Sequence, residues 1–145
     1  MNIIIFGPPG AGKGTQAKYL VKKLNNFQIS TGDMLRDEIK KDTDIGKKII
    51  NNMNDGKFVE DEIVNKLLEK IMIDSNKMNK LIFDGYPRTI SQAENLENLL
   101  DKSNQKIDYI FFLNVNKDSI IMRIEKRKIL EKRSDDDADT IIKRY

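Results

Sequence analysis

Short apolar runs alternate along the chain with longer segments in which apolar residues recur every three or four positions. The short runs are rich in Ile and Phe, and such runs predict strands that are buried on both faces of a sheet. They cover Asn2–Phe6, Phe27–Ile29, Leu81–Phe83 and Tyr109–Leu113. The longer segments predict amphipathic helices. These cover Lys13–Leu24, Ser30–Lys40, Ile45–Met53, Glu60–Ile73, Ser91–Leu100, Lys117–Arg127 and Asp135–Tyr145.

The alternation of strands and helices predicts an α/β fold. A strand that is followed by a helix and then by another strand favours a parallel sheet with helices on both faces. Ligands of such sheets bind at the carboxyl ends of the strands. A length of 145 residues suits a single domain, residues 1–145.

Composition excludes several classes of protein and of chemistry. Apolar residues make up 39% of the chain and charged residues 34%, as in a globular protein with a charged surface. No run reaches the roughly 18 apolar residues of a membrane span, and Met1 leads into the first strand without a basic leader, so we expect a cytoplasmic protein with no membrane partner. The sequence contains no Cys and no His. Disulfides, Cys/His zinc sites, thiol nucleophiles and imidazole catalysis are therefore excluded.

The charge balance argues against a nucleic-acid partner. The 26 basic residues face 23 acidic ones, which gives a net charge of +3. The most basic segment, Arg123–Arg133, contains no aromatic residue on which a base could stack. We therefore expect no nucleic-acid binding.

The segment Gly7–Thr15 follows the first predicted strand and opens the first predicted helix. Its sequence, GPPGAGKGT, has the glycines and the lysine of a loop that surrounds phosphate groups with backbone N–H groups. The start of the helix adds partial positive charge, and Lys13 can reach the β- and γ-phosphates. The general motif places Ser or Thr directly after the lysine, whereas Gly14 stands there in this chain and the hydroxyl comes at Thr15.

A loop with the threonine in this later position resembles that of the nucleoside monophosphate kinases, and of the adenylate kinase family in particular. Two further segments, Thr31–Arg36 (TGDMLR) and Phe83–Thr89 (FDGYPRT), with Gln92 behind the second, are similar to the monophosphate-site motifs of that family in the same order. The resemblance covers essentially the whole chain. It implies a three-layer P-loop kinase fold with a helical AMP-binding insertion at about residues 30–73.

The resemblance also implies roles for individual residues. The residues expected to bind ATP are Gly10, Ala11, Gly12, Lys13, Gly14, Thr15, Arg123 and Arg127. Those expected to bind AMP are Thr31, Arg36, Lys57, Val59, Gly85, Arg88, Gln92, Arg133 and Arg144. The catalytic cations are expected to be Lys13, Arg88, Arg123, Arg127, Arg133 and Arg144. Asp84, at the end of a predicted strand, is expected to orient Mg²⁺ through water. The ion arrives with ATP, and no protein-bound zinc is expected.

The carboxyl-terminal third resembles the short-lid variant of the family. Only five residues separate Arg127 from Arg133, so a short lid loop is expected at about residues 127–133. Relatives continue past the position of Tyr145 into a further strand and helix, and the chain is expected to lack these two elements.

The resemblance implies a monomeric adenylate kinase that transfers the γ-phosphoryl group of ATP reversibly to AMP and gives two ADP. One alternative is a kinase of UMP or CMP, which shares the short lid and the glycine loop, although Thr31 and Gln92 favour AMP. Another is a nucleotide-binding module that retains Lys13 but is impaired in catalysis because it cannot assemble both sites.

Overall fold

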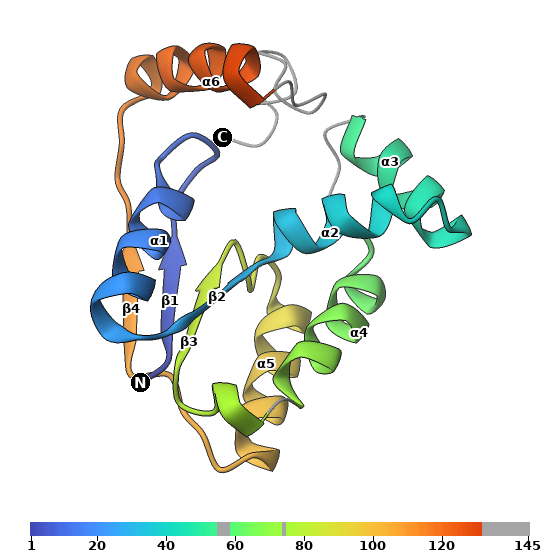
Figure 1. Ribbon diagram of the computed structural model, residues 1–145, viewed down its shortest axis with the longest axis vertical. Coiled ribbons are helices and arrows are strands. Elements are labelled where there is room, and N and C mark those ends of the chain that lie inside the picture. Colours follow the sequence, from blue (N-terminus) through green and yellow to red (C-terminus); the bar gives the residue numbers. More distant parts are fainter. Residues whose placement is uncertain (55–58, 74, 132–145) are drawn as a thin grey trace.

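The computed structural model describes residues 1–54, 59–73 and 75–131, and its centre is a four-stranded sheet (Figure 1). The strands are β1 (Ile3–Phe6), β2 (Phe27–Ser30), β3 (Leu81–Asp84) and β4 (Tyr109–Phe112), in the spatial order β2-β3-β1-β4. All three neighbouring pairs are parallel. The expected α/β fold with a parallel sheet is thereby confirmed.

Six helices accompany the strands in the described part of the chain. They are α1 (Lys13–Leu24), α2 (Thr31–Lys40), α3 (Asp44–Asn54), α4 (Asp61–Met72), α5 (Ile90–Lys102) and α6 (Lys117–Glu131). A 3₁₀ turn at Ser75–Lys77 precedes β3, and the sequence pattern did not predict it. No described helix has the length and apolar character that crossing a membrane would require.

The two faces of the sheet are covered by different helices, which gives three layers. Side chains of one strand alternate between the faces. Ile3, Ile5 and Ile82 therefore pack with Ala17 of α1. Ile4 and Phe83 point to the other face and join a larger cluster with residues of α4 and α5. Figure 1 shows α1 on one side of the sheet and α4 and α5 on the other.

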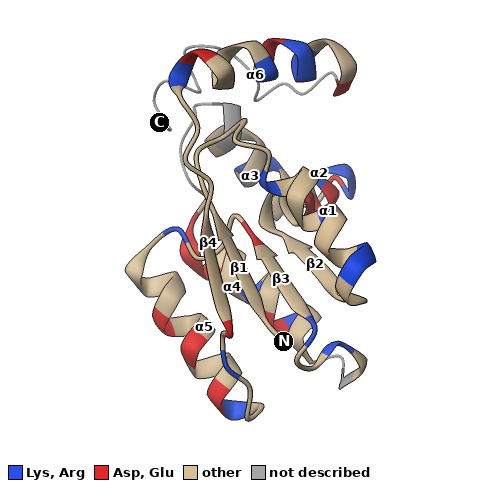
Figure 2. Cartoon of the chain, turned by 90° about the vertical axis from the view of Figure 1, so that its left-hand side faces the viewer, with Lys and Arg blue, Asp and Glu red and all other residues tan. Residues whose placement is uncertain are grey.

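The edge strand β4 differs from the expectation of a buried strand. Its side chains from Tyr109 to Phe112 are 45–69% exposed. The apolar run predicted a strand correctly, but an apolar run carries no information about which position in the sheet the strand will occupy. Figure 2 shows β4 at the edge of the sheet, beside β1.

Helix α6 is longer than expected. The periodic pattern predicted an end at Arg127, whereas the helix continues to Glu131. The described part of the expected lid loop, Lys128–Glu131, is therefore helical. The helix expected at Asp135–Tyr145 lies outside the described residues. Figure 2 shows basic and acidic residues interspersed along α6.

The register of β1 and β3 brings two loops to the same edge of the sheet. Ile5 pairs with Asp84, so both strands end at nearly the same level. The loop that begins at Gly7 and the loop that begins at Gly85 therefore leave the sheet side by side. This edge holds the carboxyl ends of the strands, where an α/β sheet binds ligands.

The opposite edge of the sheet is held by the buried side chain of Asn2. Its Oδ1 accepts a hydrogen bond from the backbone N–H of Leu81 at 3.0 Å. Its Nδ2 donates to the carbonyl oxygen of Lys106 at 3.0 Å and to Oε1 of Gln105 at 3.3 Å. One amide thus joins the start of β1 to the start of β3 and to the segment before β4.

Replacing Asn2 with Ala should lower the free energy of unfolding by about 2–3 kcal/mol, because the N–H of Leu81 then stays buried without an acceptor. Urea denaturation followed by circular dichroism measures this loss. Lys106→Ala is the control, since it keeps the carbonyl that Asn2 contacts and should change the same free energy by less than about 0.5 kcal/mol. Equal effects of the two variants would contradict the role assigned to Asn2.

Candidate functional site

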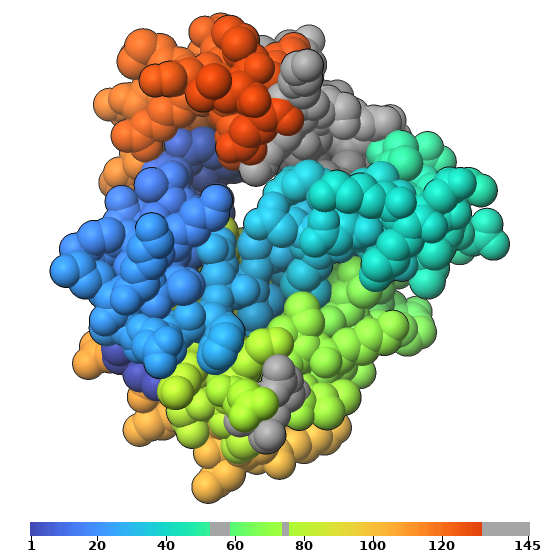
Figure 3. Space-filling model, viewed as in Figure 1, coloured from blue at the N-terminus to red at the C-terminus, as the bar shows by residue number. Residues whose placement is uncertain are grey.

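A large cleft lies at the carboxyl ends of the strands. Its volume is about 1190 Å³, above the roughly 300–1,000 Å³ that is usual for a small-molecule site. Its walls are the loop after β1, the start of α2, the loop after β3 and the inner face of α6. Figure 3 shows the hollow between the blue, cyan and orange-red parts of the surface.

The loop from Gly7 to Gly12 forms the floor of the cleft next to α6. Gly10 has a φ of +79°, and a Cβ atom there would lie 2.8 Å from Cγ1 of Ile124. Only glycine therefore allows α6 to approach the loop so closely. The helix that follows, α1, has neither a side-chain cap nor an acidic residue in its first turn. Its first N–H groups thus remain suited to an anion.

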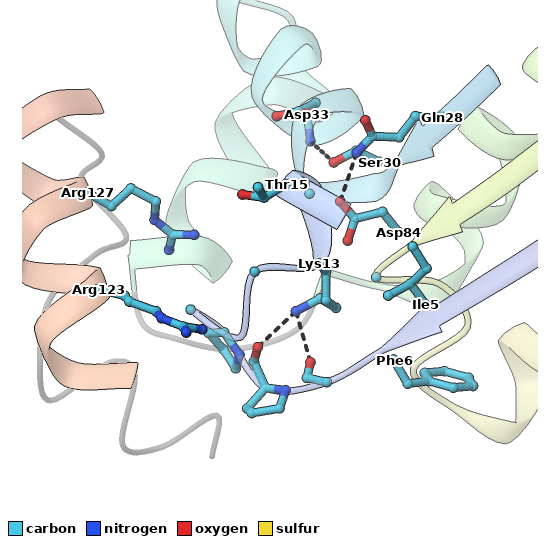
Figure 4. A pocket seen from close by; sticks show the side chains of 18 of the residues that line it. Ile5, Phe6, Lys13, Thr15, Gln28, Ser30, Asp33, Asp84, Arg123 and Arg127 are labelled. Carbon is cyan, nitrogen blue, oxygen red and sulfur yellow. Dashed lines mark hydrogen bonds between the residues drawn. The ribbon is translucent and has the colours of Figure 1, made fainter. Parts of the chain in front are cut away.

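Lys13 is the first residue of α1, and its ammonium group lies over the loop. The Nζ atom donates to the carbonyl oxygens of Gly7 at 2.9 Å and Pro8 at 3.0 Å, as the dashed lines in Figure 4 mark. The pKa of Lys13 is lowered from 10.5 to about 8, chiefly by burial; the charge of Asp84 opposes the shift, and the charges of Arg88 and Arg127 contribute to it. Lys13 is therefore a partly buried cation that would gain from a nearby anion.

Asp84 ends β3 and enters the cleft beside the loop. Its Oδ2 accepts a hydrogen bond from Nε2 of Gln28 at 2.9 Å. Burial raises the pKa of Asp84 above its usual range, although the charge of Lys13 opposes this shift. A Cβ atom on Gly14 would lie 3.3 Å from the same Oδ2. The glycine after Lys13 thus leaves space for the carboxylate.

Two arginines of α6, one helical turn apart, line the cleft from above. Figure 4 shows Arg123 and Arg127 directed from α6 toward the loop. Nη1 of Arg123 donates to the carbonyl oxygen of Ala11 at 3.2 Å. Together with Lys13, these side chains make this part of the cleft strongly cationic, as a site for a chain of phosphates requires.

A small pocket adjoins the cleft on the side of α2 and α4. It is lined by Thr31, Leu35, Val59, Val64, Gly85, Arg88 and Gln92. Its volume of about 20 Å³ has room for about one water molecule. A larger group enters only if the walls separate. The carbonyl oxygen of Gly85 accepts from Oγ1 of Thr31 at 2.9 Å and from Nε of Arg88 at 2.7 Å, which fixes one side of the pocket.

Arg36 and Arg88 bring positive charge to the wall opposite α6. The Arg36 side chain is 26% exposed, and its Nη2 donates to Oδ1 of Asp33 at 2.6 Å. Arg88 lines both the cleft and the small pocket. The two guanidinium groups therefore add positive charge to the side of the cleft formed by α2 and the loop after β3.

Most of the predicted site residues lie around this one cleft. Those that line it are Gly10, Gly12, Lys13, Gly14, Thr15, Arg36, Val59, Asp84, Gly85, Arg88, Arg123 and Arg127. Thr31 and Gln92 line the small pocket. Ala11 is buried and does not line the cleft. The predicted Lys57, Arg133 and Arg144 lie outside the described residues.

Other lining residues were missed by the sequence prediction. They include Gln28, Ser30, Asp33 and Lys126. Gln28 stands in a strand too short to show which side chains face a ligand. The position of Asp33 in the first turn of α2 is also that of an ordinary acidic residue that stabilises a helix start, so the sequence does not single it out as a site residue. Gln28 is distinguished from a surface side chain by its hydrogen bond to Asp84 across the sheet.

The arrangement brings cations and the carboxylate of Asp84 together in one cleft. The described residues contain no cluster of three acidic, His or Cys side chains that could hold a metal by themselves. Asp84 and Thr15 both line the cleft, and a lone carboxylate at the end of a strand suits Mg²⁺ that keeps its waters and is held chiefly by phosphate oxygens. The cleft therefore fits a metal that arrives with a nucleotide.

The comparisons with known proteins all point to the same family. The family model described as adenylate kinase matches residues 5–145. The adenylate kinase of Pelagibacter ubique is 55% identical over 132 residues, which are 91% of this chain and 62% of that protein. The adenylate kinase of Mycoplasma mycoides is 51% identical over 129 residues, 89% of this chain and 60% of that protein. That of a Caulobacter species is 43% identical over 144 residues, 99% of this chain and 76% of that protein. The chain spans about three fifths of the length of the first two relatives.

The lowered pKa of Lys13 predicts that ATP binding takes up a proton at a pH above about 8. Below that pH the ammonium is already charged, whereas above it the anion must restore the charge, so affinity should weaken as the pH rises. Phosphate groups, with a second pKa of about 6, are already ionised there. Calorimetry at pH 8.5 in buffers of different ionisation enthalpy measures the uptake. Lys13→Met should lose it, and the same uptake in both proteins would contradict the prediction.

Proposed function

Because the chain belongs to the adenylate kinase family, we propose that it catalyses the reversible transfer of the γ-phosphoryl group from MgATP to AMP, giving two ADP. The observation that carries this proposal is a single cleft with two cationic regions. We assign Lys13, Arg123 and Arg127, from α1 and α6, to one region, and Arg36 and Arg88, from α2 and the loop after β3, to the other. A donor and an acceptor nucleotide, both polyanions, require such a pair of regions.

In this mechanism the ATP phosphates bind along the loop after β1. Backbone N–H groups at the start of α1 donate to them, and Lys13 neutralises the β- and γ-phosphates. Arg123 and Arg127 approach from α6. Charge spreads over the transferred group in a loose transition state, so several cations around it lower the barrier.

The AMP phosphate binds in the region of Arg36 and Arg88. A guanidinium group offers a planar set of donors that matches phosphate and stays charged at every relevant pH. The attacking atom is a phosphate oxygen that is already ionised near neutral pH, so the reaction requires no general base. The absence of His from the sequence is therefore no obstacle. Positioning and charge neutralisation account for the catalysis.

Magnesium enters with ATP as part of the substrate. Asp84 would orient the ion through bound water, and Thr15 also lines the cleft. The ion supplies neutralisation of charge on the β- and γ-phosphates. Gln28 supports this role by fixing one oxygen of Asp84.

Water competes with AMP as the acceptor, so the site must close before transfer. The parts proposed to move are the AMP-binding insertion at about residues 30–73, with Lys57 and Val59, and a short lid at about residues 127–133. Arg133 and Arg144 are proposed to join the catalytic cations on closure. The narrowness of the pocket beside Gln92 supports movement of the insertion, because a base enters only when its walls separate.

AMP is favoured over UMP and CMP as the acceptor. The relatives at 43–55% identity are named adenylate kinase, and Thr31 and Gln92 line a pocket beside the acceptor region. We propose that the protein acts as a monomer, since one chain supplies both cationic regions. We also propose that it acts in the cytoplasm.

The proposed function is tested by measuring ADP formation from MgATP with AMP, CMP, UMP or no acceptor. Rapid formation with AMP alone is the expected result. Rapid formation with CMP or UMP would instead assign the chain to the pyrimidine kinases. Binding of ATP without ADP formation from any acceptor would overturn the proposal in favour of a nucleotide-binding module.

Replacing Lys13 or Arg88 with Ala should lower kcat at least about a hundredfold, because each change removes a cation that faces the transferred group. Coupled ADP detection measures the rate, and circular dichroism checks that the fold is retained. Lys23→Ala on the same helix is the control, since this exposed lysine lies over the ring of Tyr19, outside the cleft. Near-normal turnover of either site variant would contradict the assigned role.

A further inference from the structure

We propose that Asp61 is a positioning residue that fixes the orientation of the Gln92 carboxamide and thereby selects the base of the acceptor nucleotide. This inference rests on the proposed function, because it concerns the pocket beside the AMP phosphate. Asp61 is the first residue of α4 and lines neither the cleft nor the small pocket. It acts only through the side chains that it contacts.

The carboxylate of Asp61 accepts two short hydrogen bonds. Its Oδ1 accepts from Nε2 of Gln92 at 2.6 Å, and its Oδ2 accepts from Oγ1 of Thr89 at 2.6 Å. Thr89 in turn caps α5, because its Oγ1 accepts from the backbone N–H of Gln92 at 3.1 Å. Asp61 therefore joins the start of α4 to the start of α5.

The Gln92 side chain can adopt only one orientation in this network. Its Oε1 accepts from the backbone N–H of Arg88 at 2.8 Å. A carboxylate can only accept and a backbone N–H can only donate, so the amide nitrogen must face Asp61 and the amide oxygen must face Arg88. Gln92 is 3% exposed, so its contacts with Asp61 and Arg88 are largely shielded from bulk water.

These contacts leave part of the carboxamide for a ligand. An amide has two N–H donors and an oxygen with two lone pairs. In the described part of the chain, Asp61 uses one donor and Arg88 one lone pair. One donor and one acceptor thus remain at the pocket, in an order that Asp61 sets.

The remaining walls of the pocket suit a flat ring with one polar edge. Leu35, Val59 and Val64 are apolar and buried. Adenine presents an acceptor at N1 beside a donor at the 6-amino group. Hypoxanthine has nearly the same shape but reverses this order, with a donor at N1 and an acceptor at the 6-oxygen. A carboxamide of fixed orientation matches one of these edges, whereas a carboxamide that is free to flip can match both.

A second set of hydrogen bonds holds α4 to α5 independently of Asp61. The hydroxyl of Tyr86 donates to Oδ1 of Asn65 on α4 at 2.8 Å and accepts from Nδ2 of Asn95 on α5 at 3.2 Å. Replacement of Asp61 therefore removes the constraint on Gln92 while this second connection between the helices remains.

The test compares AMP with inosine monophosphate as acceptors for the wild type, Asp61→Ala and Asp61→Asn. We expect Asp61→Ala to raise the KM for AMP and to lower the AMP-to-IMP ratio of kcat/KM by about tenfold or more, the effect of about one hydrogen bond. The KM for ATP should change less than about twofold, because Asp61 lies outside the ATP region. Asp61→Asn should be intermediate, since its single oxygen can still accept from Gln92.

Glu62→Ala is the matched control. Glu62 is the neighbouring acidic residue in the first turn of α4, and it pairs with Lys66 on the surface at 2.6 Å. It should retain the wild-type AMP-to-IMP ratio. An unchanged ratio in Asp61→Ala, with or without a loss of total activity, would show a purely structural role and overturn the inference.

Calorimetric titration with AMP and IMP separates this inference from the proposed function. Preference for AMP in the wild type that is lost in Asp61→Ala supports the inference even if the protein forms no ADP, in which case only the proposed activity fails. Equal affinity of the wild type for AMP and IMP overturns the inference even if ADP is formed.

Discussion

The parallel pairing of β1 with β3 is the constraint on which the rest of the site depends. With Ile5 opposite Asp84, both strands end at the same level and their loops leave the sheet together. The side-chain period of a strand is two, so a slip of one residue would turn Asp84 from the cleft toward a helix face. Ile82 and Phe83 would exchange faces at the same time and disrupt both core layers. The core therefore holds the register that the site requires.

Burial shifts the pKa values of two charged side chains in the cleft. Lys13 is desolvated beside two arginines, and its pKa falls to about 8. Asp84 shares the same buried surroundings, and its pKa rises. Both shifts reflect the cost of charge away from water, and each group lowers that cost for the other. In the proposed reaction a phosphate chain with magnesium brings both further negative charge for Lys13 and a cation for Asp84, so its binding would relieve the two costs together.

The acceptor side of the cleft is organised by hydrogen bonds rather than by net charge. The carbonyl oxygen of Gly85 accepts hydrogen bonds from the side chains of Thr31 and Arg88. The carboxamide of Gln92 connects the Arg88 backbone to Asp61. The carbonyl and the carboxylate can only accept and the backbone N–H can only donate, which gives the pocket a defined order of donors and acceptors. The proposed binding of the phosphate and the proposed recognition of the base thus fall on adjacent parts of one network.

The sequence by itself determined the element types, the parallel α/β fold and the phosphate loop, because periodicity and glycine positions are local signals. It also supplied the motif residues that line the cleft, such as Arg36 and Arg88. Only the tertiary structure decided that β4 is exposed at the edge, since an apolar run does not reveal its neighbours. The same holds for Gln28 and Asp61, whose contacts lie 56 and 31 residues away along the chain. A hydrogen bond across such a separation leaves no periodic trace in the sequence, and folding alone brings its partners together.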